Sequence, residues 1–145
     1  MNPNGTSSAY TVLVADDNRD TVESLSALLR IAGHHVIEAH CGAQALEQGQ
    51  RWQPRVSVLD IGMPGINGYE VARLIRREPW GRESILIAHT GWCRPEDGQR
   101  AAAAGFDYHV IKPIDPDALL ALFPPAGTVQ KQCSIQSPPC YINAL

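Results

Sequence analysis

The sequence has no long apolar run and no excess of basic charge. No stretch approaches the roughly 20 apolar residues that a transmembrane helix needs. Lys and Arg number 12 against 15 Asp and Glu, a formal net charge of −3, and no basic run offers nucleic acid an electrostatic footprint. Residues 1–8 lack the basic and then apolar order of a signal peptide. We therefore expect a cytoplasmic protein that binds neither membranes nor nucleic acid directly.

Cysteine is scarce and shows no pattern. The four cysteines form no CxxC pair, so free thiols in a reducing cytosol are the simplest interpretation. The five histidines show no HxxxH on a helical pattern. A zinc site built from His35, His40 and Cys41 stays open as a weak alternative, because no ligand spacing supports it.

The length of 145 residues is that of one domain. Hydrophobic residues make up 44% and charged residues 19%, which are ordinary globular values. After residue 123 the sequence turns to Pro, Gly, Ser and Gln. We predict a flexible N-terminus at 1–9, a domain at 10–123 and an irregular tail at 124–145.

Strand and helix signals alternate along the domain. Short apolar or β-branched runs, typical of buried strands, lie at residues 10–15, 35–39, 55–59, 85–88 and 108–111. Segments with helical spacing lie between and after them, at residues 22–32, 43–52, 67–75, 96–104 and 117–123. Five β-α repeats predict an α/β fold, a parallel sheet with helices on both faces and right-handed crossovers.

Helix ends carry capping signals. Asp20 with Glu23 three residues on resembles a capping box, and Gly33 marks the end of the same helix. Asn67 with Glu70 three residues on predicts the start of the third helix.

The residues that follow the strands indicate where chemistry takes place, because ligands of open α/β sheets bind outside the carboxyl ends of the strands. The first strand ends in Asp16 and Asp17, the third in Asp60, the fourth in Thr90 and the fifth in Lys112. Each alone is more often a turn, a cap or a solvated charge. Together they place three acids, a hydroxyl and an ammonium at one rim.

Three clustered carboxylates need compensation. At 4 Å and an effective dielectric of 20, each pair repels by about 4 kcal/mol, so a cation, a shared proton or both must be present. Carboxylate oxygens select hard cations such as Mg²⁺, which leaves positions for phosphate oxygens. An Asp can also form an aspartyl-phosphate, with Lys112 and Thr90 neutralising or binding the phosphoryl oxygens.

The chain resembles the receiver domains of two-component response regulators, especially the receiver modules attached to hybrid histidine kinases. The resemblance covers about residues 10–123 and rests on four segments: VLVADDN at 12–18, VLDIGMPGINGYE at 58–70, IAHTG at 87–91 and GFDYHVIKPID at 105–115. It implies a flavodoxin-like (βα)5 fold, doubly wound, with strand order 2-1-3-4-5. It also implies a switch in a phosphorelay, as a phosphoprotein rather than an enzyme, promoting only its own aspartyl phosphorylation and dephosphorylation.

The resemblance also implies roles for the residues of the rim. Asp60 would be the phosphoacceptor, and Lys112 and Thr90 would bind the phosphoryl group. Mg²⁺ or Mn²⁺ would be held by Asp16, Asp17, Asp60 and the backbone carbonyl of Gly62. The bond between Lys112 and the proline that follows it would be cis.

The resemblance implies that signalling links Thr90 to an aromatic ring on the fifth strand, and this chain departs from that pattern. His109 stands where receivers often have Tyr or Phe. It can act with Thr90 as the switch, or be an exposed histidine at a strand end; both interpretations stay open. Trp92, two residues after Thr90, either shields the acyl phosphate or covers a loop.

The implied partners are a histidine kinase or histidine phosphotransfer protein and an unknown downstream protein, with the domain a monomer or weak dimer. The main alternative is a pseudo-receiver that binds partners without phosphorylation; the complete set of rim residues argues against it. A phosphatase of similar fold commonly has a second Asp two residues after the nucleophile, where this chain has Gly62. No GxGxxG follows the first strand, which disfavours a dinucleotide role.

Overall fold

The computed structural model describes residues 9–91, 95–112 and 114–123. Within them, five parallel strands form one sheet in the order β2-β1-β3-β4-β5. The strands are β1 (Thr11–Ala15), β2 (His35–Ala39), β3 (Val56–Asp60), β4 (Ile85–Thr90) and β5 (Tyr108–Ile111). The predicted flavodoxin-like order is confirmed, and it makes β1 and β3 neighbours.

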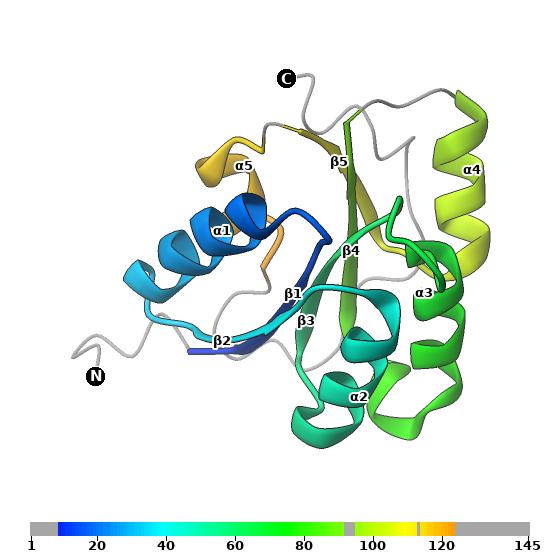
Figure 1. The fold of residues 1–145 in the computed structure, drawn as a ribbon, viewed down its shortest axis with the longest axis horizontal. Helices are drawn as coiled ribbons and strands as arrows, with labels where there is room; N and C mark the ends of the chain where they lie inside the picture. Colours follow the sequence, from blue (N-terminus) through cyan, green and yellow to red (C-terminus); the bar gives the residue numbers. More distant parts are fainter. Residues whose placement is uncertain (1–8, 92–94, 113, 124–145) are drawn as a thin grey trace.

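Helices cover both faces of the sheet (Figure 1). They are α1 (Arg19–Ile31), α2 (Gly42–Trp52), α3 (Gly68–Arg77), α4 (Pro95–Ala104) and α5 (Pro116–Leu120), with a 3₁₀ turn, η1 (Pro79–Gly81), after α3. Helices α1 and α5 lie on one face, and α2, α3 and α4 on the other. The last helix is shorter than predicted: it ends at Leu120 and not near residue 123. None of the helices in this described part could reach across a lipid bilayer.

The helix ends show which capping signals act. Helix α1 is capped by Asn18, whose side-chain oxygen accepts the N–H of Asp20 at 2.9 Å. The predicted cap at Asp20 is therefore wrong; that carboxylate lies in the first turn, where it complements the helix dipole. Gly33 follows α1 with φ +100°, as its predicted role as a helix stop requires. The cap of α3 is confirmed, since Asn67 accepts the N–H of Glu70 at 3.0 Å.

The sheet separates two hydrophobic cores. The core under α1 and α5 contains residues of all five strands, among them Val14, Val58, Ile87 and Val110. The core under α2, α3 and α4 contains the intervening strand residues, among them Leu13, Leu59 and Leu86, together with Phe106 from the loop before β5. Because successive side chains of a strand point to opposite faces of the sheet, the position of a residue along its strand decides which helices it packs against. The same rule assigns the polar residues at the strand ends to one face or the other.

Arg76 of α3 ties the connections of β4 and β5 to the helix layer. Its guanidinium donates to the carbonyls of Gly105, Gly81 and Ser84 at 2.7–2.9 Å and to the carboxylate of Asp107 at 2.8 Å. Asp107 also accepts the N–H of Leu86 at 2.9 Å. The ion pair is largely buried, with the two side chains 19% and 15% exposed. The connections before β4 and before β5 are thus both bound to one cation of α3.

We predict that Arg76→Met destabilises the domain by about 3–5 kcal/mol, because it leaves the Asp107 carboxylate and several carbonyls without their donor. Urea unfolding measures the effect. Arg73→Met is the matched control on the same helix: the side chains of its pair with Glu70 are 48% and 54% exposed, and its loss changes stability by about 0.5 kcal/mol or less. Equal effects of the two substitutions would contradict this account.

Candidate functional site

Three polar side chains lie in one row where β1, β3 and β4 end. Asp60 and His89 are paired in the β3–β4 register, and Asp16 follows the Ala15–Leu59 pair of β1 and β3. Each lies two residues beyond an apolar residue of the core under α1 and α5, so all three are on that face of the sheet. Asp16 and His89 are 0% exposed and Asp60 is 6% exposed. Parallel pairing therefore buries two carboxylates and an imidazole side by side.

Lys112 supplies the positive charge of this row. Its Nζ donates to Oδ2 of Asp16 at 2.8 Å and to Oδ1 of Asp60 at 3.3 Å. Its backbone N–H donates to the carbonyl of Thr90 at 2.7 Å, which anchors the residue at the end of β5. The structure thus brings together Asp16, Asp60 and Lys112 from three separate strand ends. The Lys112 side chain is 27% exposed, so the ammonium lies at the boundary between the row and solvent.

The two carboxylates differ in their surroundings. Burial opposes ionisation of Asp16, but hydrogen bonds from Lys112 and from the backbone N–H of Asn18 outweigh it and lower its pKa. Burial and the neighbouring Asp16 charge raise the pKa of Asp60, although Lys112 and a backbone hydrogen bond from Gly62 oppose this rise. For Lys112, burial disfavours the charge, yet the two carboxylates prevail and raise its pKa. Asp60 is therefore the less stabilised anion and keeps its oxygens more available for chemistry.

Two predicted ligands lie beside this row. Asp17 follows Asp16 and is exposed. Gly62 is also exposed, and its backbone hydrogen bond acts on the Asp60 carboxylate. Two buried carboxylates thus share one ammonium, and Asp17 adds a third acid next to Asp16 in the chain. This excess of oxygen donors and negative charge fits a hard divalent cation such as Mg²⁺.

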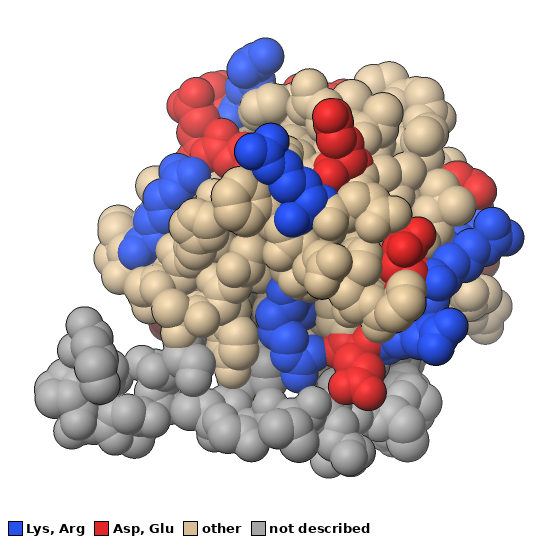
Figure 2. All heavy atoms as spheres, turned by 90° about the horizontal axis from the view of Figure 1, so that it is seen from below, with Lys and Arg blue, Asp and Glu red and all other residues tan. Residues whose placement is uncertain are grey.

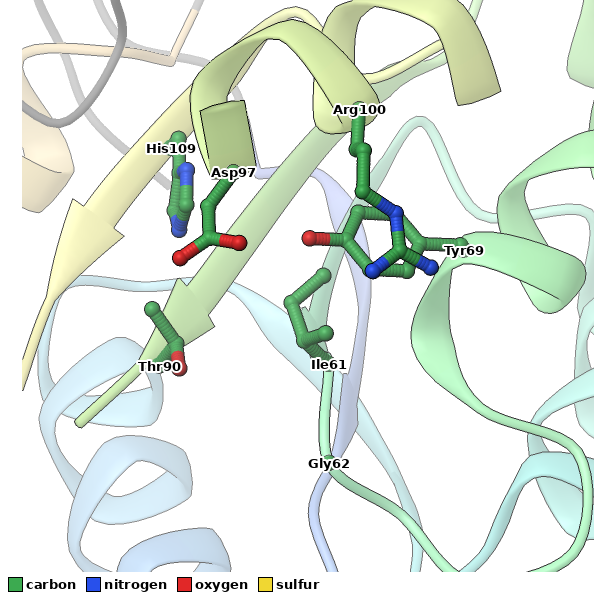
Figure 3. A pocket seen from close by; sticks show the side chains of 7 residues that line it. All are labelled: Ile61, Gly62, Tyr69, Thr90, Asp97, Arg100 and His109. Carbon is green, nitrogen blue, oxygen red and sulfur yellow. The ribbon is translucent and has the colours of Figure 1, made fainter. Parts of the chain in front are cut away.

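Thr90 and His109 lie on the opposite face of the sheet, at a cavity of about 320 Å³ below α4 (Figure 3). The cavity is lined by Ile61, Gly62, Tyr69, Thr90, Asp97, Arg100 and His109. His109 is 0% exposed, so it is not the exposed strand-end histidine that one interpretation of the sequence allowed. Gly62 lines this cavity and also acts on Asp60, so the cavity adjoins the phosphoacceptor candidate.

Charged groups of α4 face the cavity. In Figure 3 the carboxylate of Asp97 lies between His109 and the Arg100 side chain. The guanidinium of Arg100 lies 4.3 Å from the ring centroid of Tyr69, a cation–π contact between α4 and α3. Burial lowers the pKa of His109, and the charge of Asp97 opposes that shift. His109 and Thr90 thus share this cavity with the α4 residues Asp97 and Arg100.

Some expectations fall outside the part of the chain that the structure describes. Trp92 and the peptide bond between Lys112 and the following proline are among them. Among the described residues, Asp16, Asp60 and His89 form the one cluster of three potential ligands, with ligand atoms within 4.8 Å of one another. The zinc alternative through His35, His40 and Cys41 is therefore not supported.

His89 is the site residue that the sequence analysis missed. A histidine after an apolar run gives no signal of its own, and the predicted strand ended one residue earlier. The signal that could have found it is register, since a strand ending at Thr90 places His89 level with Asp60. Burial lowers the pKa of His89 to about 4; the positive charge of Lys112 adds to this, whereas Asp16 and the Ala15 carbonyl oppose it.

Comparison with known proteins identifies the family. The family model for the response regulator receiver domain matches residues 12–123 of this chain. The chain is 39% identical over 113 residues to the virulence sensor protein BvgS of Bordetella bronchiseptica, covering 74% of this chain and 9% of BvgS. The chain thus spans only a small part of that relative. The match confirms the predicted similarity to receiver modules of larger sensor proteins.

Solved structures agree with the fold. The chemotaxis protein CheY4 of Vibrio cholerae superimposes with a TM-score of 0.75 at 28% identity, covering 79% of this chain and 95% of that one. The receiver domain of a sensor histidine kinase from Pseudomonas aeruginosa superimposes with a TM-score of 0.72 at 26% identity, covering 79% and 94%, and holds a magnesium ion in its active-site cleft. The chain belongs to the response regulator receiver domain family and is a receiver domain of the two-component type.

The acidic and basic side chains of the described residues are interspersed on the side of the molecule seen in Figure 2, without a continuous basic patch there.

We predict that substitutions of Asp60 and of Lys112, which contact each other, change the stability of the domain in opposite directions. Asp60→Asn should stabilise the domain at neutral pH by about 1 kcal/mol, because it removes a buried charge that Asp16 repels. The ion pair between Lys112 and Asp16 remains in this variant. Lys112→Met should destabilise it by about 3–5 kcal/mol, because it leaves buried Asp16 without its cation. Urea unfolding at neutral pH tests both signs, and a destabilised Asp60→Asn would contradict the electrostatics described here.

We also predict that His109 makes stability depend on pH. Because burial lowers its pKa, below the ordinary value of 6.5 the unfolded chain binds a proton that the folded domain does not. The stability that His109 contributes is thus present above that value and is lost as the pH falls through the folded pKa. His109→Phe should therefore lose less stability than the parent between about pH 7.5 and 5.5. Identical losses in parallel urea titrations would show that His109 carries no such coupling.

Proposed function

We propose that this receiver domain accepts a phosphoryl group on Asp60 and thereby switches its binding to a downstream protein. The donor would be the phosphohistidine of a histidine kinase or histidine phosphotransfer protein. An oxygen of the Asp60 carboxylate attacks phosphorus, the P–N bond breaks, and the departing imidazole takes up a proton. The observation that carries this proposal is the position of Asp60, a buried carboxylate with a raised pKa that shares the Lys112 ammonium with Asp16.

The surrounding residues fit distinct tasks. Lys112, already 3.3 Å from Asp60, would bind a phosphoryl oxygen. Asp16, Asp17, Asp60 and the carbonyl of Gly62 would hold Mg²⁺ or Mn²⁺. That cation neutralises charge on the phosphoryl oxygens. The relative with magnesium in its cleft supports this assignment.

Thr90 and His109 would transmit the change. Thr90 lines the cavity below α4 together with His109 and Asp97. A phosphoryl group that binds Thr90 in one arrangement of this region supplies the differential affinity that a switch needs. We propose that α4 and β5 carry the output, in a monomer or weak dimer.

Phosphorylation by acetyl phosphate with Mg²⁺, read by intact mass, tests the proposal. The parent should gain the mass of one phosphoryl group, and Asp60→Asn should not. Lys112→Met should label about 10²-fold more slowly, because it removes a charge that stabilises the transition state. Asp20→Asn is the matched control, an exposed carboxylate at the start of α1, and should label like the parent. Unlabelled parent protein would favour the pseudo-receiver, and undiminished labelling of Asp60→Asn would move the acceptor elsewhere.

A further inference from the structure

His89 has no task in the proposed phosphotransfer, yet it lies within the charged row. Its side chain is 0% exposed, and Nε2 lies 3.6 Å from Oδ2 of Asp16. Neither ring nitrogen makes a hydrogen bond of ordinary length and geometry with another described residue, although the nearby Ala15 backbone favours the protonated ring and so raises its pKa. An imidazole without a firm partner in a dry environment is costly. A ligand at this position would compensate that cost.

The row is already a cation site. Asp16, Asp60 and His89 offer one oxygen each from two carboxylates and one ring nitrogen, all within 4.8 Å of one another. The cation that the carboxylates now share is the Lys112 ammonium. Neither ring nitrogen of His89 accepts a hydrogen bond from this ammonium in the structure. A metal cation gains from all three side chains.

The Lys112 side chain can move toward solvent and a second cavity when another cation takes its place. Its side chain is 27% exposed. It also lines a second cavity, of about 450 Å³, together with Asp20, Thr21, Ser24, Leu25 and Ile114. The carboxylate of Asp20 and two hydroxyls give the ammonium a polar and wetter environment there. Exchange of cations therefore leaves no buried charge unpaired.

The nitrogen ligand decides the class of cation. Mg²⁺ takes oxygen ligands and gives up its water reluctantly, whereas imidazole suits Zn²⁺, Co²⁺ and Ni²⁺. We propose that Asp16, Asp60 and His89 form a site for such an imidazole-binding divalent cation, which displaces Lys112. The site uses His89 and not Asp17, so it differs from the arrangement proposed for Mg²⁺.

Occupation of this site would prevent phosphorylation. The cation would compete with Mg²⁺ for Asp16 and Asp60, and Lys112 would be withdrawn from the phosphoryl position. The inference rests on the same Asp60 as the proposed function and adds a regulator to it, but the binding itself does not require that Asp60 be phosphorylated.

Calorimetric titration with Co²⁺ and, separately, Mg²⁺ tests the site through two substitutions with opposite effects. His89→Leu should weaken Co²⁺ binding by about 10- to 100-fold and leave Mg²⁺ binding within about twofold. Asp17→Asn should weaken Mg²⁺ binding and leave Co²⁺ binding within about twofold. The proton NMR spectrum of the Co²⁺ form should contain paramagnetically shifted imidazole resonances that His89→Leu lacks. Lys112→Met should bind Co²⁺ more tightly, because the competing ammonium is gone.

Two further variants separate ligation from other effects. His89→Gln keeps a hydrogen-bond donor but is a poor ligand for Co²⁺, so Co²⁺ binding at parental strength in this variant would overturn the proposal. His35→Leu removes an exposed histidine from the start of β2 and should leave the Co²⁺ affinity unchanged. A loss equal to that of His89→Leu would assign binding to surface histidines and overturn it as well. Mg²⁺ binding by His89→Leu shows that this variant is folded; if it binds neither ion, His89→Gln decides.

Labelling with acetyl phosphate distinguishes this inference from the proposed function. With Mg²⁺ alone, the parent and His89→Leu should both be labelled at Asp60. Added Zn²⁺ should slow labelling of the parent and not of His89→Leu. If the parent takes no phosphate but Co²⁺ binding depends on His89, the metal site stands and the phosphoacceptor function fails. If labelling succeeds and Co²⁺ binding ignores His89, the reverse holds.

Discussion

The parallel register of β1, β3 and β4 is the constraint on which the site depends. It sets Asp16, Asp60 and His89 level with one another on one face of the sheet, where the alternation of side chains leaves them no exposed alternative. Two buried carboxylates side by side are unfavourable alone. The Lys112 ammonium, within 3.3 Å of both, makes the arrangement tolerable. The folded state therefore depends on a cation at this position, and both the proposed phosphotransfer and the proposed exchange of cations start from this requirement.

The sequence predicted the sheet and its rim because both follow from local signals. Apolar runs bounded by turns define the strands, and polar residues directly after them must meet at one edge of a parallel sheet. What local signals cannot supply is register. His89 has the same sequence context as any polar residue at a strand end, and only its pairing with Asp60 places it in the charged row. The cap of α1 was misjudged for a related reason: Asn18 and Asp20 are both good caps, and the backbone path after β1 selects the first.

His109 shows the same limit on the other face. Its sequence position allowed an exposed ring or a buried one, and the choice depends on α4, which covers the end of β5. In the structure α4 contributes Asp97 and Arg100 to the cavity, and His109 is buried against it. The resemblance to receiver domains predicts a phenyl or phenol ring at this position, and this chain has an imidazole instead. Its coupling to α4 is therefore electrostatic as well as steric, because Asp97 faces it across the cavity (Figure 3).

The two faces are joined at the ends of β4 and β5. His89 and Thr90 are consecutive, so one lies in the charged row and the other at the cavity. Lys112 joins the same two regions, because its ammonium holds the carboxylates while its backbone N–H binds the Thr90 carbonyl at 2.7 Å. In the proposed switch, a ligand that draws the Lys112 side chain toward phosphate, or displaces it from the row, would therefore also act on the strand end that carries Thr90. The backbone hydrogen bond between Lys112 and Thr90 is the contact through which the charged row reaches the cavity below α4.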